Sequence, residues 1–179
     1  MTNRREDILR ESARLFRERG YERTSVRDIA EAVDMQSGSL FYHCKTKEDI
    51  LVEIMGMGID GLISRLNDAL LDAHTPREKL LAVLIVHLTA TLEDAPDAMS
   101  VYLFEWRSLS PVALEKLIAQ RDSYESRVNE VLAELAAAGL IAPDVKLFRL
   151  FLLGALNWTV QWYNPNGTLR ARDIAERYL

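Results

Sequence analysis

Histidine and cysteine are the side chains that most often carry nucleophilic or metal chemistry, and this chain of 179 residues has three histidines and one cysteine. His43 and Cys44 are adjacent, so on a helix they would point about 100° apart and could not act together as a dyad. His74 and His87 stand alone, without the spacing of a metal site. No glycine loop for binding phosphate is present. The sequence therefore predicts no catalytic residue, no metal, no cofactor and no enzyme activity.

A different chemistry is indicated by the small and hydrogen-bonding side chains that run from Gln36 to His43. A helix that enters the major groove of DNA needs small residues for close approach, and amides, hydroxyls or rings that reach bases and phosphates. A solvated surface helix is the alternative, because such a pattern is only moderately specific. The elements around the run decide between the two.

Those elements have the form of a helix-turn-helix. Apolar residues at helical spacing predict a helix over residues 25–33, with Thr24 as its N-cap. Asp34 and Met35 make the turn. The second helix is expected from Gln36 or Ser37 to residue 44, and Thr46 caps the helix that follows. Two short helices joined by a tight turn, the second of them polar, are typical of a DNA reader.

Residues 5–51 resemble the N-terminal domain of the TetR family of transcriptional regulators. The matching features are Leu15-Phe16, Gly20-Tyr21, Thr24-Ser25-Val26, Ile29-Ala30, Gly38-Ser39-Leu40, Tyr42-His43 and Lys47-Glu48. One departure is Cys44, where the family usually carries Phe; we interpret this lone thiol as a small core residue. The resemblance implies a ligand-responsive repressor that binds a palindromic DNA operator as a homodimer.

The expected DNA contacts follow from residue type. Base contacts are assigned to Gln36, Ser37 and Ser39, with Tyr42 near a thymine methyl or a phosphate. Phosphate contacts are assigned to side chains that flank the reader, namely Thr24, Ser25, Arg27, His43 and Lys47.

Charge and composition limit the class of protein. The net charge is −5, yet residues 1–50 hold equal numbers of acidic and basic side chains, so DNA binding must rest on a local face. An apolar fraction of 49% and a charged fraction of 27% are those of a soluble globular protein. A single cysteine excludes an internal disulfide and fits a reducing cytoplasm. The longest apolar stretch, residues 80–92, is too short to span a bilayer.

The rest of the chain reads as helices throughout. We expect an all-α fold of about nine helices, with a helix-turn-helix domain over residues 1–46 and a ligand-binding and dimerisation domain over residues 47–179. The helix after Thr46 contains Gly56, Gly58 and Gly61, which would allow either a hinge or the close approach of a neighbouring helix; the second is favoured.

A helix expected over residues 145–162 is apolar nearly all round and therefore must be covered on both sides. One side can face the core, and a second copy of the chain can cover the other, as a two-fold operator requires. The interface residues proposed are Phe148, Phe151, Leu152, Ala155 and Thr159. The alternative is an internal helix of a monomeric bundle.

Aromatic and arginine side chains indicate the effector site. A cavity lined by aromatics with one or two arginines suits a large apolar ligand with an anionic part, although aromatic pairs four residues apart are also common in plain cores. The candidates are Tyr102, Trp106, Arg107, Arg121, Trp158 and Trp162. The segment 157–167 resembles a TetR subgroup that responds to acyl-CoA thioesters in fatty-acid or steroid degradation. The alternatives are a multidrug-efflux repressor with an apolar pocket and a small-molecule-binding protein without DNA function.

Overall fold

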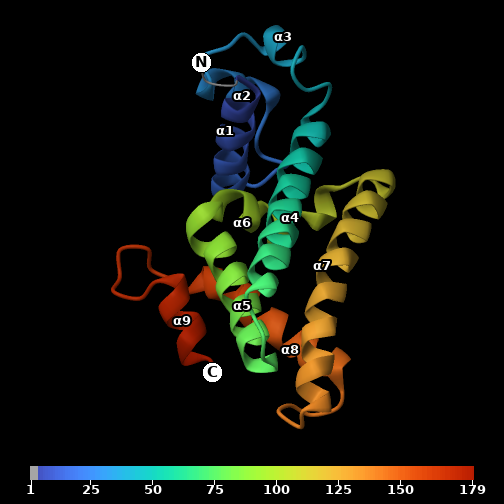
Figure 1. Ribbon diagram of the computed structural model, residues 1–179. Helices are drawn as coiled ribbons and strands as arrows, with labels where there is room; N and C mark the ends of the chain where they lie inside the picture. Colours follow the sequence, from blue (N-terminus) through green and yellow to red (C-terminus); the bar gives the residue numbers. More distant parts are fainter. Residues whose placement is uncertain (1–3) are drawn as a thin grey trace. The chain divides into compact units, whose positions relative to one another are not determined.

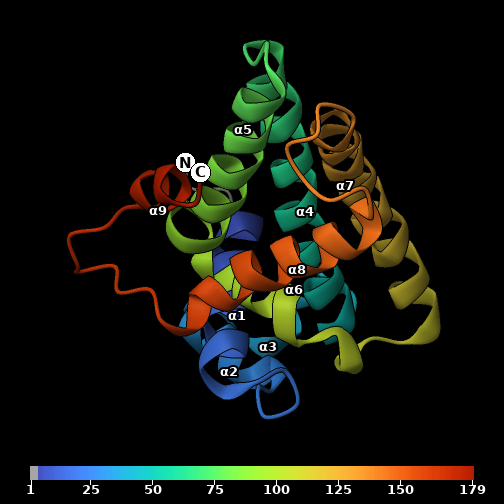
Figure 2. The same ribbon diagram turned by 90° about the horizontal axis from the view of Figure 1, so that it is seen from below.

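The computed structural model describes residues 4–179, and within them every regular element is helical (Figures 1 and 2). Nine α-helices occur in this range, and the all-α prediction is confirmed. They are α1 (Arg4–Arg19), α2 (Val26–Ala32), α3 (Ser37–Leu40), α4 (Lys47–Leu71), α5 (Pro76–Thr89), α6 (Pro96–Phe104), α7 (Pro111–Ala137), α8 (Val145–Trp158) and α9 (Ala171–Arg177). Three short segments complete them, namely the π-helix η1 (Ala90–Asp94) and the 3-10 helices η2 (Trp106–Ser108) and η3 (Thr159–Gln161).

The chain forms two compact units. The first comprises the chain up to Gly58 together with Asp97–Ile118, and the second comprises Ile59–Pro96 and Ala119–Leu179. Most of α6 and the start of α7 therefore belong to the same unit as the helix-turn-helix. The predicted functional division at residue 46 stays a prediction, because compact packing and function need not divide a chain at the same place.

In the first unit α1 packs against α2, and α2 packs against α3. Its buried stripe repeats at helical spacing and includes Ile8, Leu15 and Phe16. Gly20 ends the helix in the left-handed conformation, at φ 83°, which glycine adopts without a steric penalty. The Tyr21 ring then packs edge-on against Phe16, with centroids 5.2 Å apart. The chain therefore leaves α1 in a fixed direction toward α2.

In the second unit α5 packs against both α8 and α9 (Figure 2). The π-helix at the end of α5 directs Glu93 toward α9, where its carboxylate accepts from the backbone N–H of Ala171 at 2.9 Å. Thr75 caps α5 and forms a capping box with Glu78. Gly139 ends α7 at φ 70°, in the left-handed conformation that glycine adopts readily.

Gly58 of α4 faces Met99 of α6 at a distance that would also admit an alanine side chain, so the close approach that was favoured does not require glycine at this position. A Cβ placed on Gly58 would lie 3.4 Å from the sulfur of Met99, and both residues belong to the first unit. This is ordinary contact distance, so a larger side chain would push against α6.

Candidate DNA-binding surface, dimer face and effector residues

The start of α2 is held by Ser25, not by Thr24 as the sequence suggested. The Ser25 hydroxyl accepts from the Asp28 N–H at 3.1 Å, and the Asp28 carboxylate accepts from the Ser25 N–H at 2.7 Å. The Ser25 hydroxyl also donates to the Asp28 carboxylate at 2.5 Å, and this bond, together with the one from the Ser25 N–H, lowers the pKa of Asp28. Thr24 is completely buried, and its hydroxyl donates to the Gly20 carbonyl at 2.9 Å. The prediction that Thr24 contacts phosphate is therefore wrong, because its hydroxyl is turned inward to close the loop.

The turn between α2 and α3 lies where it was predicted. Asp34 adopts φ 52°, in the left-handed region that Asp tolerates better than most residues. The Met35 N–H reaches the Ala30 carbonyl at 2.8 Å, and the Asp34 N–H reaches Glu31 at 3.2 Å. This pair of bonds is a Schellman motif, and it fixes the direction in which the chain enters α3.

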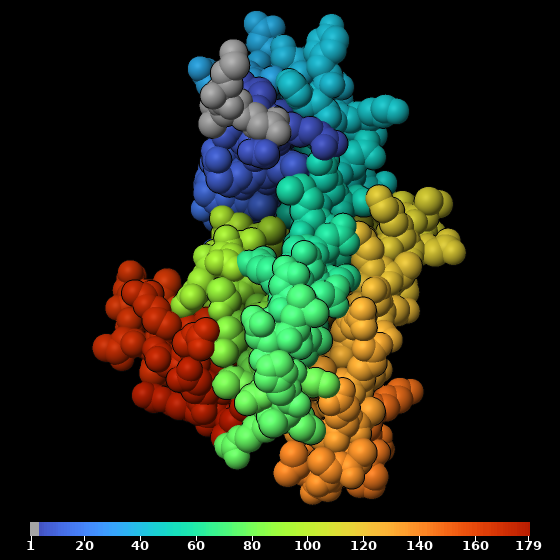
Figure 3. Space-filling view, in the orientation of Figure 1, coloured from blue at the N-terminus to red at the C-terminus, as the bar shows by residue number. Residues whose placement is uncertain are grey.

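The polar helix is shorter than predicted. Helical structure covers Ser37–Leu40 and then gives way to a turn that runs through His43. Leu40 is the buried residue of this segment, whereas Phe41 directly after it is 48% exposed. Four residues that include a glycine supply few helical hydrogen bonds. In the space-filling view this segment forms an exposed end of the first unit (Figure 3).

Most of the predicted DNA contacts lie on this exposed part of the first unit. Ser37 and Ser39 are half-buried, and Tyr42 is 92% exposed. The other exposed members of the predicted set are Ser25, Arg27, Gln36 and His43. Arg27 pairs with Glu31 at 2.9 Å, but an exposed pair of this kind contributes little and leaves the guanidinium available. Hydroxyl, amide, ring and guanidinium groups, which are the kinds that proteins use to contact DNA, therefore stand at the surface of this unit.

Lys47, a predicted phosphate contact, is bonded inside the protein. Its ammonium donates to the carbonyls of Tyr21 and Thr24, at 3.0 Å each. It also lies 3.9 Å from the centroid of the Tyr21 ring. The side chain is half-buried, so its charge is engaged before any DNA arrives.

The sequence places Arg10, Arg14 and Arg17 among acidic residues of the same helix, which predicts a solvated face of paired charges and not DNA contacts. Arg14 pairs with Glu11 and Glu18 at 2.9 Å each, which matches that interpretation. Arg10 pairs with Asp7 at 2.8 Å. Arg17 differs from the expected pairing within the helix, because it contacts Asp97 of α6 at 2.6 Å. Spacing along one helix cannot predict an ion pair between two helices.

The outer side of α8 carries a continuous apolar face. Phe151 is 71% exposed and Trp158 is 62% exposed. The other exposed members, at helical spacing, are Leu147, Leu150, Gly154 and Ala155, and we call the six together the α8 face. Of the residues predicted for the interface, Phe151 and Ala155 belong to this face, while Phe148 and Leu152 are half-buried beside it.

Thr159 does not belong to the α8 face, and its assignment to the interface is wrong. It is completely buried, and its hydroxyl donates to the Leu156 carbonyl at 2.6 Å. The helix becomes a 3-10 segment at this residue, which rotates the side chains that follow away from the α-helical register. Leu147, Leu150 and Gly154 were missed, although the same helical spacing would have found them.

The predicted effector residues are divided between the two units. Tyr102 and Trp106 lie in the first, where their rings meet edge-on with centroids 5.3 Å apart, and Arg107 is exposed there. Arg121 lies in the second and interacts with Asp122 at 2.9 Å. Trp158 and Trp162 also lie in the second, with 62% and 51% of their surface exposed. The two tryptophans therefore stand on the outside of this unit, where they were expected to line a cavity.

A buried polar cluster that the sequence did not reveal lies in the core of the second unit. His87 of α5 is 3% exposed, with Nδ1 2.9 Å from the Tyr124 hydroxyl and Nε2 3.0 Å from Asn157 Oδ1. Because the amide oxygen only accepts, Nε2 carries the proton and Nδ1 accepts from Tyr124. Burial lowers the pKa of His87 to about 4, so the ring is neutral near pH 7. The cluster joins α5, α7 and α8.

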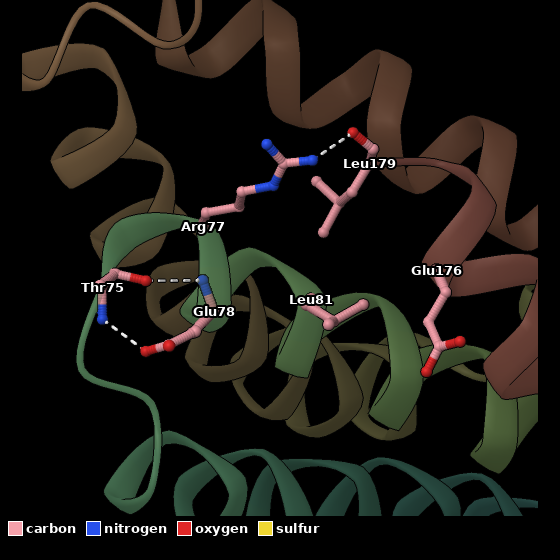
Figure 4. A pocket seen from close by; sticks show the side chains of 6 residues that line it. All are labelled: Thr75, Arg77, Glu78, Leu81, Glu176 and Leu179. Carbon is pink, nitrogen blue, oxygen red and sulfur yellow. Dashed lines mark hydrogen bonds between the residues drawn. The ribbon is translucent and has the colours of Figure 1, made fainter.

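A surface pocket of about 360 Å³ lies between α5 and α9 (Figure 4). Its lining residues are Thr75, Arg77, Glu78, Leu81, Glu176 and Leu179. Arg77 donates to the carbonyl of Leu179 at 2.7 Å across it. None of the predicted effector residues lines this pocket, and Glu78 is already committed to capping α5.

Cys44 is buried, and burial raises the pKa of its thiol, as expected for a core residue without reactivity. Among residues 4–179 there is no group of three or more side chains placed to hold a metal ion. No helix in the same range is long and apolar enough to cross a membrane.

Comparison with known families matches both parts of the chain. Residues 8–54 match the model of bacterial regulatory proteins of the tetR family, and residues 73–179 match the tetracyclin repressor-like C-terminal domain. The chain belongs to the TetR family. The predicted class, a ligand-responsive DNA-binding transcriptional repressor, is thereby confirmed.

Individual relatives cover nearly the whole chain. The HTH-type transcriptional repressor KstR2 of Mycolicibacterium smegmatis is 31% identical over 99% of this chain and 87% of its own length. The crystal structure of AibR in complex with isovaleryl coenzyme A and operator DNA is 28% identical, covers 98% of this chain and 96% of AibR, and has a TM-score of 0.88. The crystal structure of superantigen PfiT is 41% identical, covers 99% and 94%, and has a TM-score of 0.81.

Proposed function

We propose that this TetR protein is a repressor that binds a palindromic operator as a homodimer and is released from it by an acyl-CoA thioester. The observation that carries the proposal is the similarity along nearly the whole chain to AibR, whose structure holds isovaleryl coenzyme A and operator DNA together. The similarity to KstR2 repressors along the same length supports the same class. We further propose that the protein is cytoplasmic and is not an enzyme.

The DNA-reading residues in this proposal are the exposed members of the predicted set. Gln36 and Tyr42 would meet base edges, and Arg27 and His43 would meet phosphates. The half-buried Ser37 and Ser39 stay proposed base contacts beside them. Ser25 contributes through its cap, because its hydroxyl is already bonded to Asp28. Thr24 is omitted because it is buried.

The dimer in this proposal forms through the α8 face. A large exposed apolar surface on a soluble protein is costly and usually marks an interaction site. A second copy supplies an identical apolar surface, and a two-fold contact between them matches the symmetry of a palindromic operator. Trp158 therefore belongs to the interface in this account and not to the effector site.

The effector must discriminate between two states of the protein. A ligand releases DNA only if it binds the state with low DNA affinity more tightly than the state with high affinity. A difference of about 1–3 kcal/mol changes DNA affinity roughly 5- to 150-fold. Tyr102, Trp106 and Arg107, all in the first unit, remain the proposed contacts for the acyl chain and the phosphates.

The test is a titration of purified protein on DNA from upstream of its own gene, at fixed salt. Acyl-CoAs of short, long and steroid-derived chains are added, with free coenzyme A and the free acids as matched controls. Release by one thioester class, without release by its free acid or by coenzyme A, is expected. Release by free acids or hydrophobic drugs alone would reject the thioester and favour the multidrug alternative.

The relative named superantigen PfiT shows why the fold alone does not assign the function. A protein that had lost DNA function would still carry the α8 face and the helical core. The observation that favours the regulator is the set of exposed polar side chains at α2 and α3. Specific DNA binding is the property that distinguishes a repressor from a protein of the same fold without DNA function.

A further inference from the structure

The loop that joins α1 to α2, residues 20–24, is held by hydrogen bonds from two side chains, one on α4 and one at the end of α6. From α4, the Lys47 ammonium donates to the carbonyls of Tyr21 and Thr24, at 3.0 Å each, and covers the Tyr21 ring at 3.9 Å. From the end of α6, Glu105 Oε1 accepts from the Tyr21 N–H at 3.1 Å. The ring, amide and carbonyl of Tyr21 are therefore all engaged, and all these residues belong to the first unit.

Lys47 and Glu105, which bind the loop, are themselves held in position by their surroundings. Lys47 is the first residue of α4, and Thr46 and Asp49 form reciprocal bonds of 2.9 and 3.0 Å across that helix start. The second oxygen of Glu105 accepts from the Ser108 hydroxyl at 2.8 Å. A charged donor or acceptor makes hydrogen bonds about twice as strong as a neutral one. The hydrogen bonds of Lys47 and of Glu105 to the loop are therefore strong.

The position of residues 20–24 determines the position of α2 and α3, the two helices proposed to contact DNA. Thr24 directly precedes the cap of α2, and the Schellman motif at Asp34 fixes α3 relative to α2. Any shift of residues 20–24 relative to α4 therefore moves α2 and α3 together. For DNA readout this matters, because base contacts tolerate little displacement of the reading side chains.

We propose that Lys47 and Glu105 form a clamp on Tyr21 that positions the helix-turn-helix for DNA, and that Lys47 acts as a positioning residue and not as a phosphate contact. The proposal rests on the DNA-binding function proposed above. It differs from the sequence-based prediction for Lys47, which considered only the charge. In the structure two of the three N–H donors of the ammonium already have protein carbonyls as partners.

Salt dependence separates the two roles of Lys47. A lost phosphate contact lowers the slope of log affinity against log salt by about 0.9. A lost positioning contact reduces the fraction of protein that is ready to bind, and so weakens binding equally at every salt concentration. For Lys47→Met we expect an affinity loss of about tenfold, equivalent to about 1.4 kcal/mol, with an unchanged slope. Lys45→Met, which removes an exposed lysine two residues earlier, is the matched control.

Lys47→Arg adds a test that preserves the charge. A planar guanidinium cannot place one compact nitrogen between two carbonyls and an aromatic ring. The clamp therefore predicts that Lys47→Arg weakens binding with an unchanged slope, whereas a phosphate contact predicts binding close to that of the wild type. A slope lowered by about 0.9 in Lys47→Met, together with normal binding by Lys47→Arg, would overturn the proposal.

Amide hydrogen exchange tests the clamp in the free protein, without DNA. The Tyr21 amide is bonded to Glu105, and the Thr24 amide is bonded to the Tyr21 carbonyl at 3.1 Å. We expect faster exchange at both amides in Lys47→Met and in Glu105→Ala, and no change in Lys45→Met. Unchanged exchange in the first two variants would overturn the clamp. Absence of DNA binding by the wild type would instead overturn the proposed function, and the clamp would still be judged by exchange.

Discussion

At the scale of single residues, the same chemical group serves different purposes according to where the backbone places it. Thr24 and Ser25 are neighbours with similar hydroxyls, yet one closes a buried loop and the other caps α2 at the surface. Trp158 was expected in a cavity and stands on the α8 face. Residue type was predictable from DNA chemistry, but inward or outward direction depends on packing between elements, which a single sequence does not contain.

Arg27 is the residue for which a phosphate contact is most directly testable. Its side chain is 82% exposed, and its pair with Glu31 is an exposed one that contributes little. We expect Arg27→Ala to weaken binding to all DNA sequences and to lower the salt slope by about 0.9, because one counterion fewer is released. Arg172→Ala, which removes an exposed arginine with a similar pairing on α9, is the matched control. A variant of Arg27 that lost affinity for one base change alone would contradict the assignment.

His87 gives the protein a pH dependence with a definite sign. Its pKa is lowered from 6.5 to about 4 in the folded protein. Between these two values the imidazole is protonated in the unfolded chain and neutral in the folded protein. Its contribution to the free energy of unfolding is therefore complete above pH 6.5 and is lost as the pH falls toward 4. The loss is on the order of 3 kcal/mol, at 1.36 kcal/mol for each unit of pKa.

Urea unfolding at pH 7 and at pH 4.5 measures that loss. Relative to wild type, His87→Gln should be less stable at pH 7, because it breaks the bonds to Tyr124 and Asn157. It should also depend less steeply on pH, because the titrating group is gone. If the stabilities of wild type and variant changed in parallel over this range, His87 would not be the group responsible.

At the scale of elements, the turn between α2 and α3 was predicted well, whereas the cap of α2 was assigned to Thr24 and lies at Ser25. Gly20, Asp34, Thr75 and Gly139 all end or begin helices as their chemistry requires. The length of α3 was not predicted, because a helix of four residues depends on its neighbours more than on propensity. The end of α8 was missed for a related reason, since the change to a 3-10 segment after Trp158 leaves no signal in the apolar pattern.

The turn at Asp34 provides a test of stability at this scale. Its positive φ of 52° is strained for a β-branched residue and unstrained for glycine. We expect Asp34→Val to lower the free energy of unfolding by about 1–2 kcal/mol, and Asp34→Gly to leave it unchanged or raise it slightly. Thermal or urea unfolding of the two variants provides the measurement. Equal stability of Asp34→Val and wild type would mean that the turn relaxes without cost.

At the scale of the whole molecule, the α8 face is the feature that an isolated chain leaves unexplained. The sequence of this helix, which is apolar nearly all round, predicted that a partner covers it. The residues predicted to contact that partner coincide only in part with the α8 face. Phe151 and Ala155 lie on this face, whereas Thr159 is buried where the helix type changes. The effector residues could not be assigned from sequence, because aromatic pairs look alike in a core, in a cavity and at an interface.

Phe151→Glu tests the dimer. A carboxylate in the centre of two facing apolar surfaces would be buried without a partner, so we expect monomers in sedimentation experiments at concentrations where wild type is dimeric. Val112→Glu is the matched control, because Val112 is an exposed apolar residue of α7, 81% exposed, outside the α8 face. Dimers of unchanged stability in Phe151→Glu would remove α8 from the interface.

Sequence-specific binding of DNA is the central property of this account, and one measurement tests it most directly. Wild type and Tyr42→Ala are titrated on DNA from upstream of the gene and on shuffled DNA of the same composition, at two salt concentrations. We expect wild type to prefer the natural fragment by at least about 1000-fold, and Tyr42→Ala to lose much of that preference while keeping weak binding to both. Equal affinity of wild type for the natural and shuffled fragments, repeated with fragments selected from random sequence, would contradict the account.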